Sequence, residues 1–327
     1  MKSFAFAIGL SVAAPLSVIA AQAQEITLHL GHVQQANHPM QTSSEVFADL
    51  VAERTGGAVR IVVHPAEQLA GLRAGAEGVQ LGTIDMYWTD SGTLGNWAPQ
   101  YGFVSLPFIF EDFAASIAAM DALEADIVES MRADLNVERL AWSPSGFRVI
   151  LSRTKPVHAA GDMRGLKIRV PEIPLYVSAF GALHANATPL PWGDVYSALQ
   201  TGVVDAVEGP PAAILTSALQ EVVQHMTRTN HIMTDLNLLM NLDRFNALTP
   251  EQQQIVREAA REAVNGGLRD LLAADEERSY QALAEVLETD ETPDIDSFRT
   301  AMEPVYAEFI GSAGGNAAAW VAAAQGN

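Results

Sequence analysis

Short apolar runs alternate with amphipathic stretches near the start of the chain, and this alternation limits the folds open to it. Ile26–Leu30, Val59–Val63 and Ile84–Trp88 are rich in the residues that favour buried strands. Between these runs, one stretch ending at Thr55-Gly56-Gly57 and another over Glu67–Leu81 have helical spacing. A β-α-β-α-β order of this kind predicts an α/β fold.

The same order of elements returns in the second half without any repeat of sequence. We predict a helix over Asp112–Leu135 and a long one from Thr249 to about Thr289, which Gly266-Gly267 interrupts only weakly. The other predicted elements, before one last helix from Ile295, are Arg139–Trp142, Phe147–Leu151, Lys167–Val170, Pro174–Leu183, Gly193–Gln200, Val203–Val207 and Pro210–Val222. Because 327 residues exceed one core of typical size, we expect two α/β lobes, with the long helix either crossing both or bending.

The first 23 residues have the pattern of an export signal. Lys2 precedes an apolar stretch from Phe4 to Ala20, and Ala21-Gln22-Ala23 provides the small-residue end that a signal peptidase cleaves. We therefore expect a signal peptide over residues 1–23 and a mature chain from Gln24. The alternative is a membrane anchor, since the apolar stretch is nearly long enough to cross a bilayer. No later segment is apolar over that length, so we expect no stable membrane insertion after cleavage.

The charge of the chain is negative overall but positive in one segment. The formal net charge of −20 would repel nucleic-acid phosphates and anionic lipids, so neither is an expected partner. The absence of cysteine excludes disulfides, thiolate metal sites and a cysteine nucleophile. From Arg139 to Arg169, however, there are seven Lys and Arg residues and one acid, Asp162. This segment is either the binding region for an anion or a solvated basic face.

Two arginines of this segment are candidates for binding a carboxylate. Arg169 lies at the end of a predicted strand that Pro171 terminates, where a side chain points into the crevice beyond the sheet. Arg148 starts another predicted strand in a similar way. Guanidinium groups on adjacent strands could together bind one carboxylate through bidentate hydrogen bonds. The alternative is a structural ion pair with a nearby acid such as Glu172 or Glu208.

Three more residues are candidates for the walls of such a site. Trp192 lies at a predicted helix start, where its ring could form a platform for a ligand or belong to the core. Tyr87 and Trp88 end a predicted strand, so the alternation of side chains turns one of them toward the cleft. Asp90 could accept hydrogen bonds from a ligand or cap the next segment through an Asx-type turn.

Several motifs that mark enzymes and cofactor sites are missing. The chain has no phosphate-binding or dinucleotide-binding glycine loop, no hydrolase nucleophile elbow and no H-E-x-x-H zinc motif. His29, His32 and His38 are close in sequence, but without a carboxylate at ligand spacing we interpret them as loop and packing residues. Two of the 39 acids could form the carboxylate pair of a glycosidase, yet such pairs arise by chance in so acidic a chain. We therefore expect a protein that is not an enzyme and needs no cofactor or metal.

A series of short motifs extends over nearly all of the chain after the leader. They include Leu30-Gly31-His32-Val33, Gly78–Met86, Leu106-Pro107-Phe108, Gly146-Phe147-Arg148, Gly165–Pro171, Trp192–Tyr196 and Ala198–Asp205. In this order the motifs resemble the solute-binding proteins of TRAP transporters, the tripartite ATP-independent periplasmic systems that capture dicarboxylates, sialic acid and other organic acids. Each motif is weak by itself, whereas the ordered set is specific.

This resemblance implies roles for individual residues. It assigns the carboxylate clamp to Arg169, with Arg148 assisting, and it places Trp192 and Asp90 in the pocket. Trp88, Glu208 and Gly209 complete the set of expected substrate-binding residues. Relatives usually have Asn at the position of Gly209, so the polarity of the pocket and the room in it should differ there.

The resemblance also implies a two-lobed fold of the periplasmic-binding class II type, with a central cleft and a long C-terminal helix that bridges both lobes. Chain crossings are expected near Gly146, near Thr234 and within that helix. We expect lobe I to comprise residues 24–146 and about 235–274, and lobe II residues 147–234 and about 275–327.

The function that the resemblance implies is capture of a small organic acid, a carboxylate or a sulfonate, in the periplasm. The expected partners are the integral membrane permease subunits of the transporter, to which the acid would be delivered. The same pocket would serve a periplasmic sensor that presents its ligand to a receptor. A secreted hydrolase is a third alternative.

Overall fold

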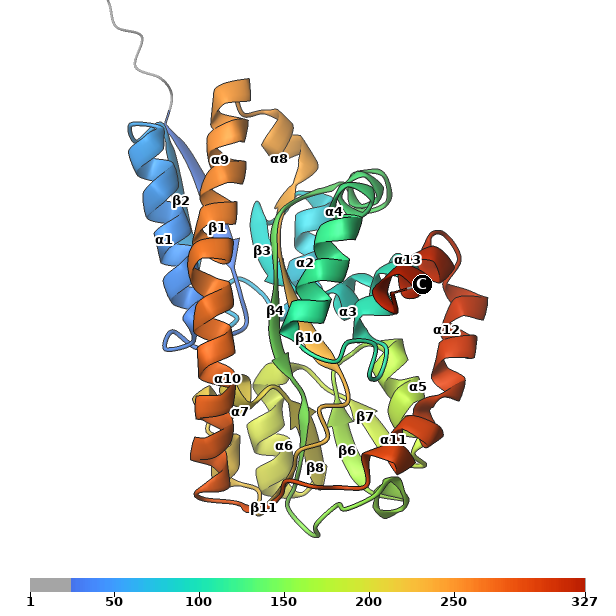
Figure 1. The fold of residues 1–327 in the computed structure, drawn as a ribbon. Coiled ribbons are helices and arrows are strands. Elements are labelled where there is room, and N and C mark those ends of the chain that lie inside the picture. Colours follow the sequence, from blue (N-terminus) through green and yellow to red (C-terminus); the bar gives the residue numbers. More distant parts are fainter. Residues whose placement is uncertain (1–24, 327) are drawn as a thin grey trace, which may run out of the picture.

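The computed structural model describes residues 25–326 and contains two β-sheets. The first has the strand order β2-β1-β3-β10-β4 and the second the order β11-β9-β5-β8-β6-β7. Figure 1 shows the first sheet in the upper half of the molecule and the second in the lower half, with helices around both. The prediction of a two-lobed α/β fold is confirmed, whereas the expected signal peptide lies outside the described residues.

Three parallel strands and two connecting helices begin the first lobe as predicted. They are β1 (Ile26–Gly31), α1 (Pro39–Arg54), β2 (Val59–His64), α2 (Leu72–Leu81) and β3 (Met86–Thr89). The expected helix start at Glu67 is wrong, because Ala66 and Glu67 have φ angles of 51° and 61°. Such left-handed backbone does not fit a right-handed helix, so α2 begins only at Leu72.

Two long antiparallel strands, β4 (Val137–Phe147) and β10 (Met233–Asn241), connect the two lobes. β5 follows β4 directly and belongs to the second sheet, so the chain passes from one sheet to the other there. The sequence did not predict β10 as a strand, because Asp235, Asn237 and Asn241 interrupt its apolar run. All three side chains are buried and hydrogen-bonded.

The second sheet is built from shorter strands than the first. Its elements are β5 (Val149–Ser152), β6 (Lys167–Val170), α5 (Pro174–Ala182), β7 (Asn186–Pro189), α6 (Val195–Thr201), β8 (Ala206–Gly209), α7 (Pro211–Thr216), β9 (His225–Thr227) and β11 (Glu288–Asp290). β8 pairs antiparallel with β5 and parallel with β6, so it lies between them. β7, β9 and β11, each of three or four residues, were not predicted.

A long helical segment follows β10 and α8 (Leu242–Asn246) and confirms the predicted bridge. It consists of α9 (Pro250–Ala263), a π-helical turn over Val264–Leu268, and α10 (Arg269–Ala284). The π turn coincides with Gly266-Gly267, where helix propensity is lowest. α9 packs against α1 of the first lobe and α10 against α7 of the second, as Figure 1 shows.

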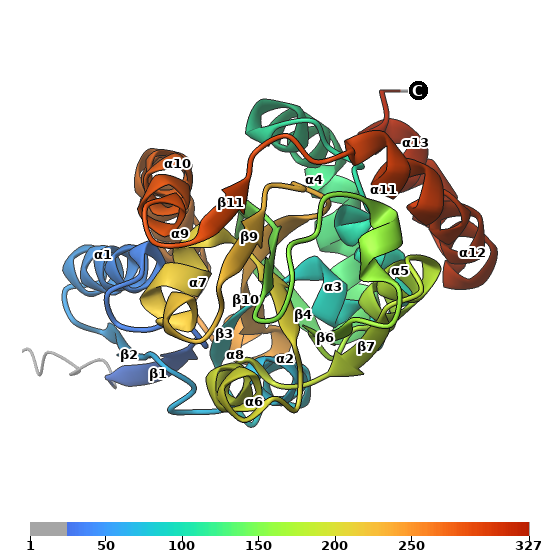
Figure 2. The same cartoon turned by 90° about the horizontal axis from the view of Figure 1, so that it is seen from below.

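Three C-terminal helices replace the single expected one, because Pro304 and Gly314 divide the segment. α11 (Ile295–Met302) and α12 (Pro304–Ala313) pack on α5, whereas α13 (Ala317–Ala324) packs on α4 (Phe113–Leu135). Figure 2 shows them on the side of the molecule opposite α9 and α10. The predicted lobe bounds stay a prediction, and we propose moving α13 to lobe I because α4 belongs to that lobe.

Tyr87 faces away from Trp88 and is buried between two glycines. Its hydroxyl donates a hydrogen bond of 2.6 Å to the carbonyl oxygen of Ala70. A Cβ atom on Gly31 of β1 would lie 2.7 Å from the ring, and one on Gly75 of α2 would lie 2.3 Å from Cζ. Only glycine therefore allows α2 and β1 to approach this ring.

We expect Gly75→Ala to lower the free energy of unfolding by about 1–3 kcal/mol, because the ring of Tyr87 is held by its hydrogen bond and cannot move aside. Gly71→Ala is the matched control, since the nearest atom to a Cβ there is 3.9 Å away, on the flexible side chain of Glu67. Chemical denaturation of both variants measures the difference. Equal midpoints for the two would contradict the packing argument.

Candidate ligand-binding site

A cavity lies between the lobes, and both sheets and the connecting strands line it. Its lining residues are Val33, Gln34, Met40, Leu72, Trp88, Thr89, Asp90, Ser145, Arg148, Arg169, Pro171, Ile173, Tyr176, Trp192, Pro210, Ala213, Thr234 and Leu236. Its volume of about 70 Å³ is several times the roughly 10–15 Å³ that one water molecule requires. Among the expected site residues, Trp88, Asp90, Arg148, Arg169 and Trp192 come together here, whereas Glu208 and Gly209 lie behind the lining.

Arg169 is a buried cation on the wall of this cavity. Its Nε and Nη2 atoms donate hydrogen bonds of 2.9 and 2.6 Å to the carbonyl oxygen of Leu190, and its Cζ lies 5.3 Å from the ring centroid of Trp192. Within residues 25–326 no carboxylate lies at ion-pair distance, so the structural ion pair with Glu172 or Glu208 does not form. Burial lowers the pKa of Arg169 to about 10, which leaves the group charged at neutral pH.

Arg148, by contrast, is neutralised by Glu208. Its Nε and Nη2 atoms bond both carboxylate oxygens, Nη2 at 2.6 Å from Oε1, and Nη1 donates to Thr234 Oγ1 at 2.7 Å. Burial alone would raise the pKa of Glu208, but the charge of Arg148 and the hydrogen bonds from His231 and Arg148 together outweigh burial and lower that pKa to about 2. His231 Nε2 lies 3.4 Å from Oε2, the same oxygen that accepts from Arg148 Nε. For Arg148 the ion-pair alternative is therefore the one that the structure has.

The expectation that Arg148 and Arg169 lie on adjacent strands is wrong. β8 is inserted between β5 and β6, and it brings Glu208 opposite Ile150, two residues along from Arg148. The order of strands in a sheet cannot be read from local spacing, so the sequence did not show this. The two guanidinium groups are consequently not equivalent, since only Arg169 lacks an acidic partner in the described part of the chain.

Two tryptophans form fixed walls of the cavity. Trp88 of β3 donates from Nε1 to Ser44 Oγ at 2.9 Å, and Trp192 donates from Nε1 to Ser217 Oγ at 3.1 Å. Each ring is thus held by a polar anchor on its outer edge. Gly209 lies behind Trp192, because a Cβ atom there would be 3.4 Å from the indole ring. A Cβ atom at that distance makes an ordinary van der Waals contact, so a side chain at this position would begin against the ring of Trp192.

Asp90 both caps a helix and lines the cavity. Its Oδ1 accepts a hydrogen bond of 2.6 Å from the backbone N–H of Thr93 in α3 (Ser91–Leu94), which confirms the capping alternative. Burial, and then the charge of Asp235, raise the pKa of Asp90 to about 6. The carboxyl group therefore changes charge within the physiological range of pH.

Two further residues of the cavity wall, Gln34 and Thr89, were not predicted. Gln34 Oε1 and Thr89 Oγ1 are buried and have no hydrogen-bond partner among residues 25–326. Gln34 follows β1 and Thr89 ends β3. A signal was available, because ligands of α/β folds bind at the carboxyl ends of parallel strands.

Three further cations of the Arg139–Arg169 segment are paired by acids outside it, whereas Lys155 and Arg164 form no ion pair in the described residues. Arg139 is bonded to Glu124, and Arg153 and Lys167 flank Asp205 at 3.7 and 3.4 Å. The positive segment is therefore largely neutralised in space and does not form one basic face. Arg169 is the buried member of the segment that is left without an acid in the described residues.

The three histidines near the start of the described chain, at positions 29, 32 and 38, have separate hydrogen-bond partners. His32 Nε2 lies 2.8 Å from Gln41 Oε1, and His38 caps α1 by accepting from the N–H of Met40. Within residues 25–326, no three His, Asp or Glu side chains are grouped so that they could hold a metal ion. No helix in the same range is long and apolar enough to cross a membrane.

Comparison with known proteins places this fold and cavity in a family. The family model described as bacterial extracellular solute-binding protein, family 7, matches residues 30–312. The chain belongs to this family. It is thus a solute-binding protein of the TRAP type, and such proteins are periplasmic and bind their ligands without converting them.

Three relatives illustrate the family. The 2,3-diketo-L-gulonate-binding periplasmic protein of Escherichia coli is 29% identical over 285 residues, which is 87% of this chain and 86% of the relative. A TRAP periplasmic solute-binding protein from Polaromonas, solved with D-erythronate, has a TM-score of 0.87 at 29% identity and covers 92% and 98% of the two chains. One from Sulfitobacter, solved with β-D-galacturonate, has a TM-score of 0.86 at 28% identity and covers 92% and 100%.

Proposed function

We propose that this solute-binding protein captures a hydroxylated carboxylic acid of the sugar-acid type and delivers it to the permease subunits of a TRAP transporter. The observation that carries the proposal is that Arg169 is buried without an acidic partner in the described chain. Buried charges in proteins are paired, and Arg139 and Arg148 each have an acid, whereas Arg169 has none in the described chain. A ligand carboxylate supplies the missing counter-charge.

The surroundings of Arg169 suit a planar anion. Leu190 holds two of its nitrogens from one side, and the ring of Trp192 lies against the guanidinium group. A guanidinium group held in this way is ready to bond a carboxylate with little further loss of side-chain freedom. Arg148 lines the same cavity, but Glu208 already neutralises its charge. Arg148 would therefore assist binding by its position beside the ligand and would not act as a second clamp.

Hydroxyl groups on the ligand would satisfy the rest of the cavity. Gln34 Oε1 accepts hydrogen bonds, Thr89 Oγ1 donates and accepts, and Asp90 adds a carboxyl group. A buried polar atom without a partner costs about 1–3 kcal/mol, so an acid with an alkyl chain would leave these groups unsatisfied. The relatives solved with D-erythronate and β-D-galacturonate support this class of ligand.

Capture and delivery would be coupled through the two lobes. Trp88, Thr89 and Asp90 come from β3 and the turn that follows it in the first lobe, whereas Arg169 and Trp192 come from the second lobe. A ligand that gains contacts from both sides shifts the equilibrium toward the closed protein. The closed, loaded form would be the one that the permease subunits bind.

Calorimetric titration with matched compounds tests this proposal. The acids are erythronate, galactonate and galacturonate, and erythronate and galactonate are each compared with the alkyl acid of the same length and with the neutral polyol. We expect at least one sugar acid to bind in the micromolar range, its alkyl acid at least about tenfold more weakly, and its polyol without measurable heat.

Each arm of this titration can contradict one part of the proposal. Equal binding of the alkyl acid would contradict the role of the hydroxyl groups, and equal binding of the polyol would contradict the role of Arg169. Recovery of a chemically altered ligand would contradict a binding function without turnover.

A further inference from the structure

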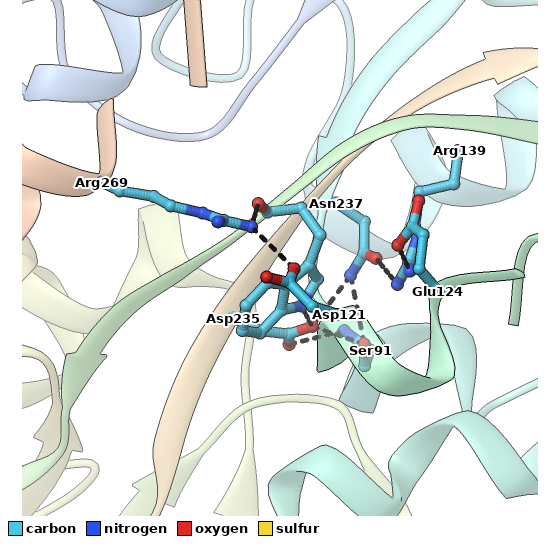
Figure 3. Close-up of polar contacts among 8 residues, drawn as sticks. Ser91, Asp121, Glu124, Arg139, Asp235, Asn237 and Arg269 are labelled. Carbon is cyan, nitrogen blue, oxygen red and sulfur yellow. Dashed lines mark hydrogen bonds and ion pairs between the residues drawn. The ribbon is translucent and has the colours of Figure 1, made fainter. Parts of the chain in front are cut away.

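Asp235 of β10 is a buried carboxylate that several donors surround. Its Oδ1 accepts from the backbone N–H of Ser91 at 2.9 Å. Its Oδ2 accepts from Ser91 Oγ at 2.5 Å, from Trp142 Nε1 at 2.8 Å and from Asn237 Nδ2 at 3.0 Å. Figure 3 shows the side chains of Ser91 and Asn237 beside that of Asp235. So many donors hold the carboxylate in one orientation.

The charged groups around this cluster are already paired with other partners. Arg139 is bonded to Glu124 and approaches the cluster only through Asn237 Oδ1, at 3.5 Å. Arg269 donates to the carbonyl oxygen of Trp142 at 2.9 Å and lies 3.7 Å from Asp121. No cation of the described chain forms an ion pair with Asp235. Burial raises the pKa of this carboxyl group, and the hydrogen bonds that it accepts from Ser91, Trp142 and Asn237 oppose that rise.

Ser91 connects Asp235 to the ligand site. Ser91 does not line the cavity itself. It directly follows Asp90, which does line it, and it is the first residue of α3. Asp235 binds both the backbone and the side chain of Ser91, and Asn237 Nδ2 adds a third bond, of 3.1 Å, to Ser91 Oγ. The turn that presents Asp90 is thus fixed from behind by β10.

The strand geometry explains how one strand serves both places. A β-bulge lies between Thr234 and Asp235. On one side of it, Thr234 lines the cavity and accepts from Arg148, and on the other Asp235 turns into the first lobe. Because of the bulge, Thr234 reaches the ligand site directly, whereas Asp235 reaches it through Ser91.

We propose that Asp235 is a positioning residue for the ligand site, which fixes the Asp90-Ser91 turn against the cavity and sets how Asp90 meets an acidic ligand. The inference rests on the proposed function for its effect on binding, but its effect on Asp90 itself does not depend on any ligand. Asp235 does not line the cavity, so it would act on a ligand only through this turn.

The charge of Asp235 gives this role a measurable signature. The groups that face Asp90 are Asp235 of β10, Arg148 between β4 and β5, and Tyr176 of α5. Below a pH of about 6, where its raised pKa lies, Asp90 is neutral and can donate a hydrogen bond to an anionic ligand. Above that pH it is negative and repels the ligand. Affinity for an acid should therefore fall as the pH rises from 6 to 8, by up to about tenfold per pH unit for one coupled proton.

The experiment compares the affinity for a sugar acid between pH 5 and 8 in the wild-type protein and four variants. Asp90→Asn should lose the pH dependence, which identifies the group. In Asp235→Asn the midpoint should move to lower pH by about half a unit or more, because a like charge is removed from beside Asp90. Ser91→Ala should weaken binding several-fold at every pH without moving the midpoint, since the charge of Asp235 remains.

Trp142→Phe is the matched control, because it removes a donor to the same oxygen of Asp235 but leaves the Asp235 side chain and its two bonds to Ser91 in place. Its midpoint and affinity should stay within about twofold of the wild type. A midpoint for Asp235→Asn that coincides with the wild type would overturn the inference. If Asp235→Asn does not fold, equal losses of affinity in Ser91→Ala and Trp142→Phe would overturn it instead.

A measurement without ligand separates this inference from the proposed function. Carbon-13 NMR titration of the aspartate carboxyl groups, with Asp90 assigned by its absence in Asp90→Asn, reports the midpoint directly. If the titration midpoint of Asp90 is lower in Asp235→Asn than in the wild type, the inference is supported even when no sugar acid binds. Absence of binding would contradict the proposed function alone. If the midpoint of Asp90 is the same in both proteins, the inference is overturned even where binding is normal.

Discussion

Replacing Arg169 by methionine is expected to weaken binding of the organic acid by about 10- to 100-fold while the ligand-free protein stays as stable as the wild type or becomes more stable. A hydrogen bond to a charged group contributes about 1.5–3 kcal/mol, which corresponds to that loss of affinity. The stability does not fall, because the buried guanidinium group has no acid in the described chain and methionine of similar length removes its desolvation cost.

Two comparisons sharpen the test of Arg169. Arg169→Lys should also bind more weakly than the wild type, since a point charge cannot form the two-pronged contact. Arg164→Ala removes an exposed cation of the same segment and should change neither affinity nor stability. Calorimetry and chemical denaturation give the two quantities. A loss of stability in Arg169→Met without a loss of affinity would show that Arg169 serves the fold and not the ligand.

The sequence predicted the elements that carry strong local signals. The helix after Asp112 begins where its capping side chain accepts from Ala115, and the helix after Thr249 begins with a capping box. β10 was missed because a run with three polar residues does not look like a buried strand. Those residues are tolerated only because the folded chain brings them donors and acceptors from α2, α3 and β4, which no local pattern shows.

The same distinction between local and distant information applies to the site. Arg169, Trp88, Asp90 and Trp192 were found because each lies at a strand end or helix start that the sequence marks. The state of Arg148 could not be found, because its partner Glu208 is separated from it by 60 residues and lies on a strand whose place in the sheet depends on the whole topology. Sequence position located the candidate cations, and only the structure showed which of them has an acid.

The second large effect is expected for Glu208→Gln, which should lower the free energy of unfolding by about 3–5 kcal/mol at pH 7. The substitution keeps the shape of the side chain but leaves Arg148 charged, buried and without its acid. Asp205→Asn is the matched control, because Asp205 precedes the same strand and also faces two cations, but it is partly exposed. A pair of that kind contributes at most about 1 kcal/mol.

The pH dependence of stability and a double variant distinguish an uncompensated charge from a simple loss of packing. Because the pKa of Glu208 is lowered to about 2 in the folded protein, its contribution is complete above its ordinary value and is lost as the pH falls toward 2. The wild type should therefore lose this stability at acid pH, whereas Glu208→Gln lacks it throughout. Arg148→Met combined with Glu208→Leu should recover most of the stability, since no charge then remains buried. If the double variant is as unstable as Glu208→Gln, the loss comes from shape and not from charge, and the assignment of Arg148 as a neutralised, assisting group in the cavity fails with it.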